Sequence, residues 1–289
     1  MRVIVGSVPG LSTHRSATIG AVLVILLVAL AVVGPLIAGD PSALDIDHGL
    51  SALGAPLPPS SDAVLGTDAL GRDVWARIAA GAGTSLSIAG VATALALVFG
   101  VALGLLAGTG SDRIDNALMR FVDLALAFPF LLLAILLAAL FREAELGSAT
   151  AHVSLPLALV GWTTFARVIR TKTRVLARSE FALAARALGA SATRVVLRHL
   201  LPNLAGTIAV VAAFTFAQNL LGEAALSYLG LGPPPPAPTW GRMLYEGRAF
   251  YRTAPWLIIA PGTAILLAVI SFNLLSEGLR ERFDRGGAR

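Results

Sequence analysis

The residues best suited to polar recognition lie in a basic segment between two apolar runs. From Phe181 to Asn203 the chain carries three arginines (Arg186, Arg194 and Arg198), one histidine and no acidic residue. Arginine binds carboxylates and phosphates through a planar group of fixed donors, and basic clusters beside membranes attract anionic lipid. The segment therefore indicates a docking surface, either for a protein partner or for a lipid surface.

Residue types and spacing exclude several other kinds of chemistry. The chain has no cysteine, which excludes disulfides, thiol catalysis and cysteine-ligated metals. Its single lysine, Lys172, lies in "RTKTR" and not in the Gly-rich turn that holds nucleotide phosphates. The four histidines are far apart in sequence, so they do not suggest a local metal site. We expect no catalytic residue, no metal and no cofactor bound by this chain.

Polar residues inside the apolar runs are few. Thr215, Gln218 and Asn219 fall at i, i+3 and i+4 on one face of an expected helix, where they could line a substrate path or hydrogen-bond between helices. Asp123 is the one ionisable candidate for ion coupling, and a position at the membrane boundary is the favoured explanation of it.

The composition is that of a membrane protein. Of 289 residues, 56% are hydrophobic and 13% are charged, whereas soluble domains carry about 25% charge. A helix needs roughly 20 apolar residues to cross the bilayer core. Pro129 is expected to kink the third of the predicted spans. These spans are 17–38, 85–108, 123–140, 149–166, 204–221 and 256–275.

The basic residues predict the orientation. Sixteen of the 22 Lys and Arg residues lie in the termini, the loop after the second span and the segment 167–203, and six lie in the alternate loops. Because cytoplasmic loops carry the excess of Lys and Arg, both termini and the basic segment are expected in the cytoplasm. The first outer loop has six aspartates against two arginines, which fits the opposite side.

Two stretches of the predicted outer loops carry possible contact residues. Asp68, Arg72 and Asp73 in "GTDALGRD" either cap a short helix or contact a partner protein outside the membrane.

The second stretch, "GPPPPAP" at 232–238, is expected to be extended and stiff and is followed by Trp240, a residue suited to the membrane interface. Pro235, Pro236 and Trp240 could form an outer gate or a landing surface for that protein, or the stretch could be a spacer.

A glycine series in the second span predicts close helix packing. Gly100, Gly104 and Gly108 recur every four residues, and small residues at this spacing let helix backbones approach in lipid. The partner helix is expected within this chain, with a dimer interface as the alternative.

The basic segment has the pattern of two short helices joined by a bend. The apolar residues from Phe181 to Leu188 follow helical spacing. Gly189 can end that helix because glycine adopts the left-handed cap conformation without strain. Ser191 can cap a second helix, and Pro202 is expected to end the segment.

These residues resemble a known element. The spacing of Ala184-Ala185, Gly189 and Leu201-Pro202 resembles the EAA loop of membrane subunits of binding-protein-dependent ABC importers. "VLGTDALGRDVWARIAAGAGTSLSIA" (64–89), "EAALSYLGLGPPPPAPTWGRML" (223–244) and "NLLSEGLRERFD" (273–284) are similar to the C-type permease of the dipeptide/oligopeptide branch. The resemblance covers most of the chain from residue 64 onward.

The resemblance implies an all-α polytopic membrane protein with six transmembrane helices and a type I ABC importer (MetI-like) permease core. It divides the chain into a tail with the first helix (1–40), an extracytoplasmic loop (41–84), a permease core (85–278) with a coupling loop at 180–203, and a cytoplasmic tail (279–289). It implies a transport subunit of the bacterial plasma membrane and not an enzyme. This subunit would form half of a pathway for di- or oligopeptides received from an external binding protein.

The implied partners are a second, homologous permease in a pseudo-symmetric heterodimer, two ATPase subunits that bind ATP and Mg, and the external binding protein. The resemblance also implies contact with membrane lipid, and it implies no nucleic-acid partner. The alternatives are another cargo such as haem, nickel or glutathione, an ion-coupled transporter, or a lipid-binding membrane scaffold.

In this family the EAA loop docks into a groove of the ATPase subunit and carries its motion to the membrane helices. Leu183 stands where the motif commonly has glutamate, so docking would rest on shape, Gly189 and the arginines. The implied coupling residues are Leu183, Ala184, Ala185, Arg186, Gly189, Ala190, Arg194, Arg198, His199, Leu201 and Pro202.

Overall fold

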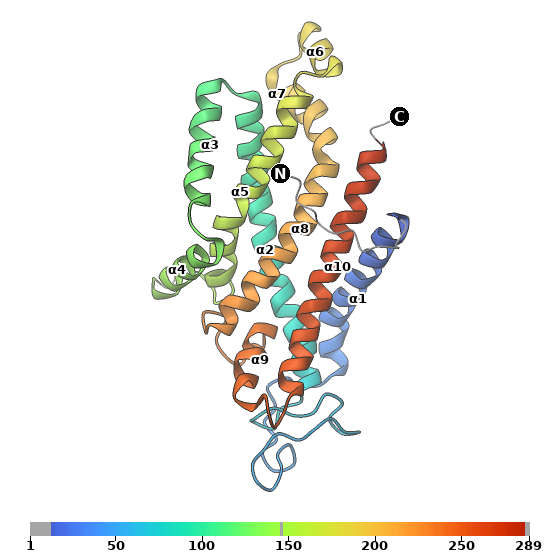
Figure 1. The fold of residues 1–289 in the computed structure, drawn as a ribbon, viewed down its shortest axis with the longest axis vertical. Helices are drawn as coiled ribbons and strands as arrows, with labels where there is room; N and C mark the ends of the chain where they lie inside the picture. The colour runs from blue at the N-terminus through green and yellow to red at the C-terminus, as the bar shows by residue number, and fades with distance from the viewer. Residues whose placement is uncertain (1–12, 145–146, 287–289) are drawn as a thin grey trace.

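The computed structural model describes residues 13–144 and 147–286 and is helical through most of these ranges. Figure 1 shows the long helices side by side, with a loop of residues 38–73 below them and α6 at the opposite end. The elements are α1 (Thr13–Ile37), α2 (Val74–Thr109), α3 (Asp112–Leu126), α4 (Phe130–Glu143), α5 (Ala151–Leu176), α6 (Glu180–Ala187), α7 (Ala192–Val195), a π-helical turn (Val196–Leu200), α8 (Leu201–Tyr228), α9 (Trp240–Gly247), a 3₁₀ turn (Arg248–Phe250) and α10 (Trp256–Gly286).

Five helical runs in the described ranges are long and apolar enough to cross a membrane, and there are six if α3 and α4 count as one span. This agrees with the predicted membrane class. Several helices are longer than the predicted spans. For example, α2 begins at Val74, inside the stretch that the sequence analysis assigned to the outer loop. Its 36 residues measure about 54 Å at 1.5 Å per residue, well beyond a bilayer core of about 30 Å.

The third predicted span, 123–140, is wrong as a single kinked helix. The chain forms two helices, α3 and α4, which meet at 86° across a break at residues 127–129. Pro129 precedes the first residue of α4. A proline has no N–H to donate and disfavours helical geometry in the residue before it, so the break falls there.

The glycine series of α2 packs against α5 within this chain, as expected. A Cβ added at Gly100 would lie 2.5 Å from the Cβ of Phe165 and from the carbonyl oxygen of Trp162. At Gly104 it would lie 2.8 Å from the Cβ of Ile169. The two helices therefore cross at a distance that only glycine permits, and α5 is held against the longest helix of the fold.

Candidate functional site

The segment 180–203, which we call the coupling loop after the role predicted for it, has the expected helix, bend and helix. Gly189 joins α6 to α7 with φ of +83°, the left-handed region that favours glycine. Ser191 caps α7, because its hydroxyl accepts a hydrogen bond from the backbone N–H of Arg194 at 3.3 Å. The local signals in the sequence were therefore sufficient to predict this element.

The loop has a small core of its own. Ala177, Ala182, Val195 and Leu200 are buried together, and they bring the end of α5, α6, α7 and the π-helical turn into one unit. Packed elements transmit a displacement where a mobile loop would absorb it. The coupling loop is thus built as an extension of α5 and α8.

The predicted end of the loop at Pro202 is wrong. α7, the π-helical turn and α8 continue as one helical run from Ala192 to Tyr228, and Pro202 lies in the first turn of α8. The missing N–H of proline is compensated locally, because the π-helical turn shifts the pairing and Leu201 donates to the carbonyl of Val196. The side-chain amide of Asn203 donates to the carbonyl of His199 at 2.6 Å.

The outer face of the loop combines apolar and basic side chains. Leu188 is 89% exposed and Leu183 is 52% exposed. Arg186, Arg194 and Arg198 are exposed, and none of them forms a salt bridge within the described ranges. Ala184, Gly189 and Pro202 are also exposed, while Ala185, Ala190, His199 and Leu201 are half-buried.

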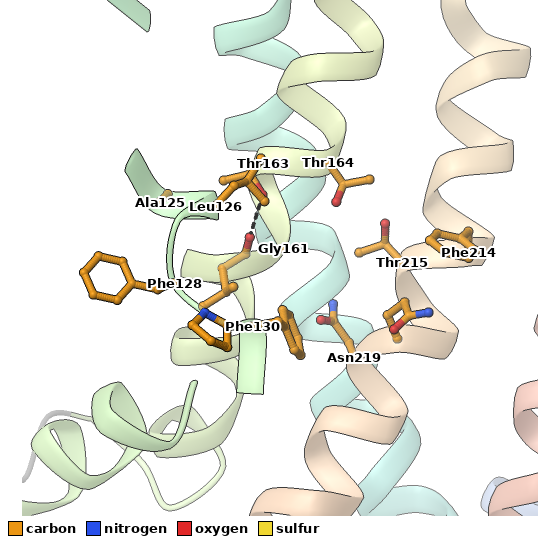
Figure 2. Close-up of a pocket in the computed structure, with 13 residues that line it drawn as sticks. Ala125, Leu126, Phe128, Phe130, Gly161, Thr163, Thr164, Phe214, Thr215 and Asn219 are labelled. Carbon is orange, nitrogen blue, oxygen red and sulfur yellow. Dashed lines mark hydrogen bonds between the residues drawn. The ribbon is translucent and has the colours of Figure 1, made fainter. Parts of the chain in front are cut away.

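A cavity of about 420 Å³ lies between the α3–α4 break, α5 and α8. Figure 2 shows Thr163 and Thr164 of α5 facing Thr215 and Asn219 of α8, with Phe128 and Phe130 beside the break. Gln218 completes the polar lining. The three residues predicted to share a face, Thr215, Gln218 and Asn219, therefore do line one cavity.

Polar atoms in this cavity have unused hydrogen-bonding capacity. The Asn219 side-chain nitrogen donates to the Thr93 hydroxyl at 3.0 Å. The Asn219 carbonyl oxygen and the Thr215 hydroxyl have no partner within the described part of the chain. Buried polar groups without partners are costly, so these two atoms mark an unsatisfied polar spot beside the cavity. Every lining side chain is uncharged.

Asp68 and Asp73 both form contacts within the chain, and Asp73 has the expected capping role while Asp68 does not cap a helix. Asp73 caps α2 by accepting a hydrogen bond from the backbone N–H of Trp75 at 2.8 Å. Asp68 is 5% exposed and accepts from the backbone N–H of Leu70 and Arg72 at 2.8 and 3.1 Å. The capped helix is the long α2 and not a short helix of the loop.

A network of ion pairs joins the outer loop, residues 38–73, to α9. Arg77 is 3% exposed and pairs with both Asp68 and Glu246, and Arg72 pairs with the same two carboxylates. Burial opposes ionisation of Glu246, but the neighbouring Arg77, Arg242 and Arg72 outweigh it, so the pKa of Glu246 lies below its ordinary value. The loop and α9 are thus held as one outer unit.

The Pro-rich stretch, residues 232–238, does not have the fully extended shape that was predicted for it. A turn at residues 235–236 interrupts it, so it is not extended throughout. Pro235 and Pro236 are exposed. Trp240 is fully buried, and its indole N–H donates to the carbonyl of Ile78 at 3.0 Å. Trp240 therefore anchors α9 on α2 and does not lie at the surface of this chain.

Sequence reasoning missed Glu223, an acidic residue that is fully buried in α8. Its carboxylate accepts a hydrogen bond from Ser227 at 2.6 Å. The predicted span ended at residue 221, because span assignment by hydropathy stops where a charged residue appears. An acidic residue two positions beyond the end of an apolar run was the available signal in the sequence.

Comparison with known proteins agrees with these observations. The family "Binding-protein-dependent transport system inner membrane component" matches residues 100–287. The chain is 36% identical to the dipeptide transport system permease protein DppC of Alkalihalophilus pseudofirmus, over 95% of this chain and 87% of that protein. It is 33% identical to the oligopeptide transport system permease protein OppC of Bacillus subtilis, over 94% of this chain and 86% of that protein. It is 39% identical to the glutathione transport system permease protein GsiD of Pectobacterium atrosepticum, over 78% and 73%.

Among solved structures, the chain resembles the MetNI methionine ABC transporter in an inward-facing conformation. The TM-score is 0.58 at 19% identity, over 73% of this chain and 94% of the other, which shows the shared fold. The sequence match and the MetI-like helical core agree with each other. The chain belongs to the binding-protein-dependent transport system inner membrane components, the membrane-spanning permease subunits of ABC importers.

Proposed function

We propose that this permease forms half of a translocation pathway for di- and oligopeptides, with both termini and the coupling loop in the cytoplasm. Relatives that match about 95% of the chain are named dipeptide and oligopeptide permeases. The cavity supports this cargo, because neutral hydroxyl and amide groups suit peptide bonds and the three phenylalanines suit apolar side chains. A peptide entering here meets no charged side chain of this subunit.

The observation that carries the transport mechanism is the coupling loop. Its exposed leucines and free arginines suit a groove with an apolar floor and acidic rim on an ATPase subunit. Leu183, in place of the usual glutamate, adds apolar contact where the family motif offers a charge. The self-packed core of the loop supports transmission of ATPase closure into α5 and α8.

If this chain forms half of the translocation pathway, the complex needs further subunits. A second, homologous permease closes the exposed side of the cavity, two ATPase subunits supply ATP and Mg²⁺ chemistry, and an external protein delivers the cargo. We propose that the exposed Pro235 and Pro236 meet that protein directly. Asp68, Arg72, Asp73 and Trp240 then act by fixing the shape of this surface, since their side chains are engaged within the chain.

Glutathione is the second candidate cargo, because a relative of 39% identity is named a glutathione permease. Glutathione is itself a small peptide with additional charge. The neutral lining of the cavity favours short peptides without extra charge over it.

Reconstitution tests the proposal. The chain is co-expressed with the second permease, ATPase subunits and binding protein from its own genome, and the complex is placed in proteoliposomes. We expect ATP-dependent uptake of labelled di- and tripeptides at higher rates than of glutathione. The purified chain alone is expected to hydrolyse no ATP. Uptake of glutathione in preference to peptides would refute the proposed peptide cargo. ATP hydrolysis by the isolated chain would refute the proposal that separate subunits hydrolyse ATP.

Single-cysteine labelling tests the orientation. The chain has no cysteine, so Ala192→Cys introduces a unique thiol in the exposed part of the coupling loop. In intact cells an impermeant maleimide should leave this thiol unlabelled and should label the control Leu53→Cys, whose native side chain is 96% exposed in the outer loop. The reverse pattern would show that the charge count assigned the two sides wrongly.

A further inference from the structure

Ion pairs join α3 to α5 along their length. The acidic members belong to α3 and the basic members to α5, and the pairs follow each other in antiparallel order. Asp123 contacts Arg167 at 2.6 Å, Asp115 contacts Arg170 at 2.5 Å, and both Asp112 and Asp115 contact Arg174 at 3.1 Å. We call these contacts the α3–α5 ion-pair series.

α3 has few other attachments. Only Asp115 and Val122 of its residues are buried, and Phe121 stacks on Trp162 of α5 with ring centroids 5.6 Å apart. Met119 packs beside Val122 on the core shared with α2 and α5, whereas other apolar side chains, such as Leu124 at 62% exposure, are exposed. The ion-pair series is therefore the main polar connection between α3 and the rest of the subunit.

Asp115 is the centre of the series. Its side chain is 2% exposed, whereas Asp112 and Asp123 are 92% and 67% exposed. Arg170 holds it through two parallel hydrogen bonds, a geometry that fixes orientation as well as distance. Exposed pairs contribute little and are screened by salt, so the Asp115–Arg170 contact determines how firmly α3 follows α5.

The end of α5 contacts the coupling loop, and the end of α3 contacts the cavity. α5 ends at Leu176, and its last residue packs on the small core of the coupling loop. α3 ends at Leu126, and Leu126, Phe128 and Pro129 at the break line the cavity. A displacement of the loop thus has a continuous path through α5 and the ion pairs to the cavity wall.

We propose that Asp115 and Arg170 are positioning residues that make α3 and α5 move as one body, so that the coupling loop moves the α3–α4 wall of the cavity. This inference rests on the proposed transport function. Apart from these charges, α3 rests on α2 and α5 through the apolar contacts of Met119, Phe121 and Val122. Apolar contacts are not directional, so the ion pairs determine how closely the wall follows α5. The ion-pair series therefore sets the coupling between ATP hydrolysis and opening of the cavity.

The first measurement breaks the central contact. In the reconstituted complex, Arg170→Gln keeps polar contact with Asp115 but loses the charge and the paired donors. The number of peptides moved per ATP is expected to fall roughly tenfold, with ATPase subunits still bound and ATP still hydrolysed. A fall in transport and hydrolysis in equal proportion would contradict a coupling role and favour a general loss of folded complex.

The second measurement restores the connection elsewhere. Asp123→Cys/Arg167→Cys places two thiols at the exposed end of the series, with partner subunits cleared of reactive cysteine. A short bis-maleimide linking α3 to α5 should leave transport normal in the otherwise unchanged chain and should recover coupling in the Arg170→Gln background. If the link stops transport in the unchanged chain, the two helices slide during transport and the proposal is wrong.

The proposed function and the role of the ion-pair series are refuted by different results. An unmodified complex that neither transports peptide nor responds to its binding protein would refute the proposed function. An unmodified complex that transports, together with an Arg170→Gln variant of normal coupling, would refute only the role of the ion-pair series.

Discussion

Gly189→Glu is expected to leave the chain folded and inserted while removing the ATPase subunits or uncoupling their hydrolysis from transport. An ideal Cβ at Gly189 would meet no atom within 4 Å, so the isolated subunit accommodates a side chain there. The strain of a non-glycine residue at φ of +83° is about 1 to 2 kcal/mol, which one loop can absorb.

The large effect arises at the partner surface. A glutamate at the bend projects from the most exposed part of the loop, beside Leu188 at 89% exposure. It would carry a charge into a groove shaped for apolar contact, opposite in sign to the arginines of the same face. Loss of a central contact in an interface costs about 2 kcal/mol or more, roughly thirtyfold in affinity. The measurement is co-purification of ATPase subunits together with transport in proteoliposomes.

The chain offers a matched control at the other end of the molecule. Gly39 also has φ of +83° and open surroundings, but it follows α1 at the outer end. Gly39→Glu carries the same strain and the same charge, so it should retain assembly and coupled transport. Normal assembly and coupling in Gly189→Glu as well would mean that the segment is a basic loop facing lipid.

The coupling loop could be predicted because its signals are local. A glycine at the bend, a serine cap and helical spacing lie within a dozen residues, and each determines the backbone near itself. The break at Pro129 was predicted only as a kink, because a proline marks where a helix is interrupted and not the angle between the two halves. That angle of 86° depends on how α3 and α4 pack on α5.

Contacts between distant residues could not be predicted from one sequence. Asp115 and Arg170 are 55 positions apart, and Asp123 was the one aspartate of α3 that the sequence analysis considered, as a boundary residue or a candidate for ion coupling. Once α2 and α5 are packed through glycine, the arginines of α5 lie opposite the aspartates of α3. Glu223 and Trp240 were misplaced for a similar reason, since burial depends on which helices surround a residue and not on its own hydropathy.

Gly100→Leu is expected to have the largest effect on stability. A Cβ at this position would lie 2.5 Å from both the Phe165 Cβ and the Trp162 carbonyl oxygen, and real Cβ contacts are longer. Because one of these atoms is backbone, the two helices must separate, and the contacts at Gly104 and Gly108 are lost together. Overpacking of a tight core lowers the free energy of unfolding by about 1 to 3 kcal/mol. Because two whole helices must separate, we expect the loss in this variant to be at least as large as the upper value of that range. Thermal unfolding of the purified subunit in detergent, followed by tryptophan fluorescence, measures the loss.

Gly262→Leu is the matched control, because Gly262 is also a helical glycine but has no atom within 4 Å of its added Cβ. It should unfold at the same temperature as the unmodified chain or higher, since leucine is more favourable than glycine in a helix by roughly 0.5 to 1 kcal/mol. A similar loss in both variants would mean that any larger residue in a long helix destabilises the subunit. A loss confined to Gly100→Leu would assign the stability to the α2–α5 crossing. That crossing also holds Arg170 in place for Asp115, so the same variant should lose coupled transport in the assembled complex under conditions where the subunit remains folded.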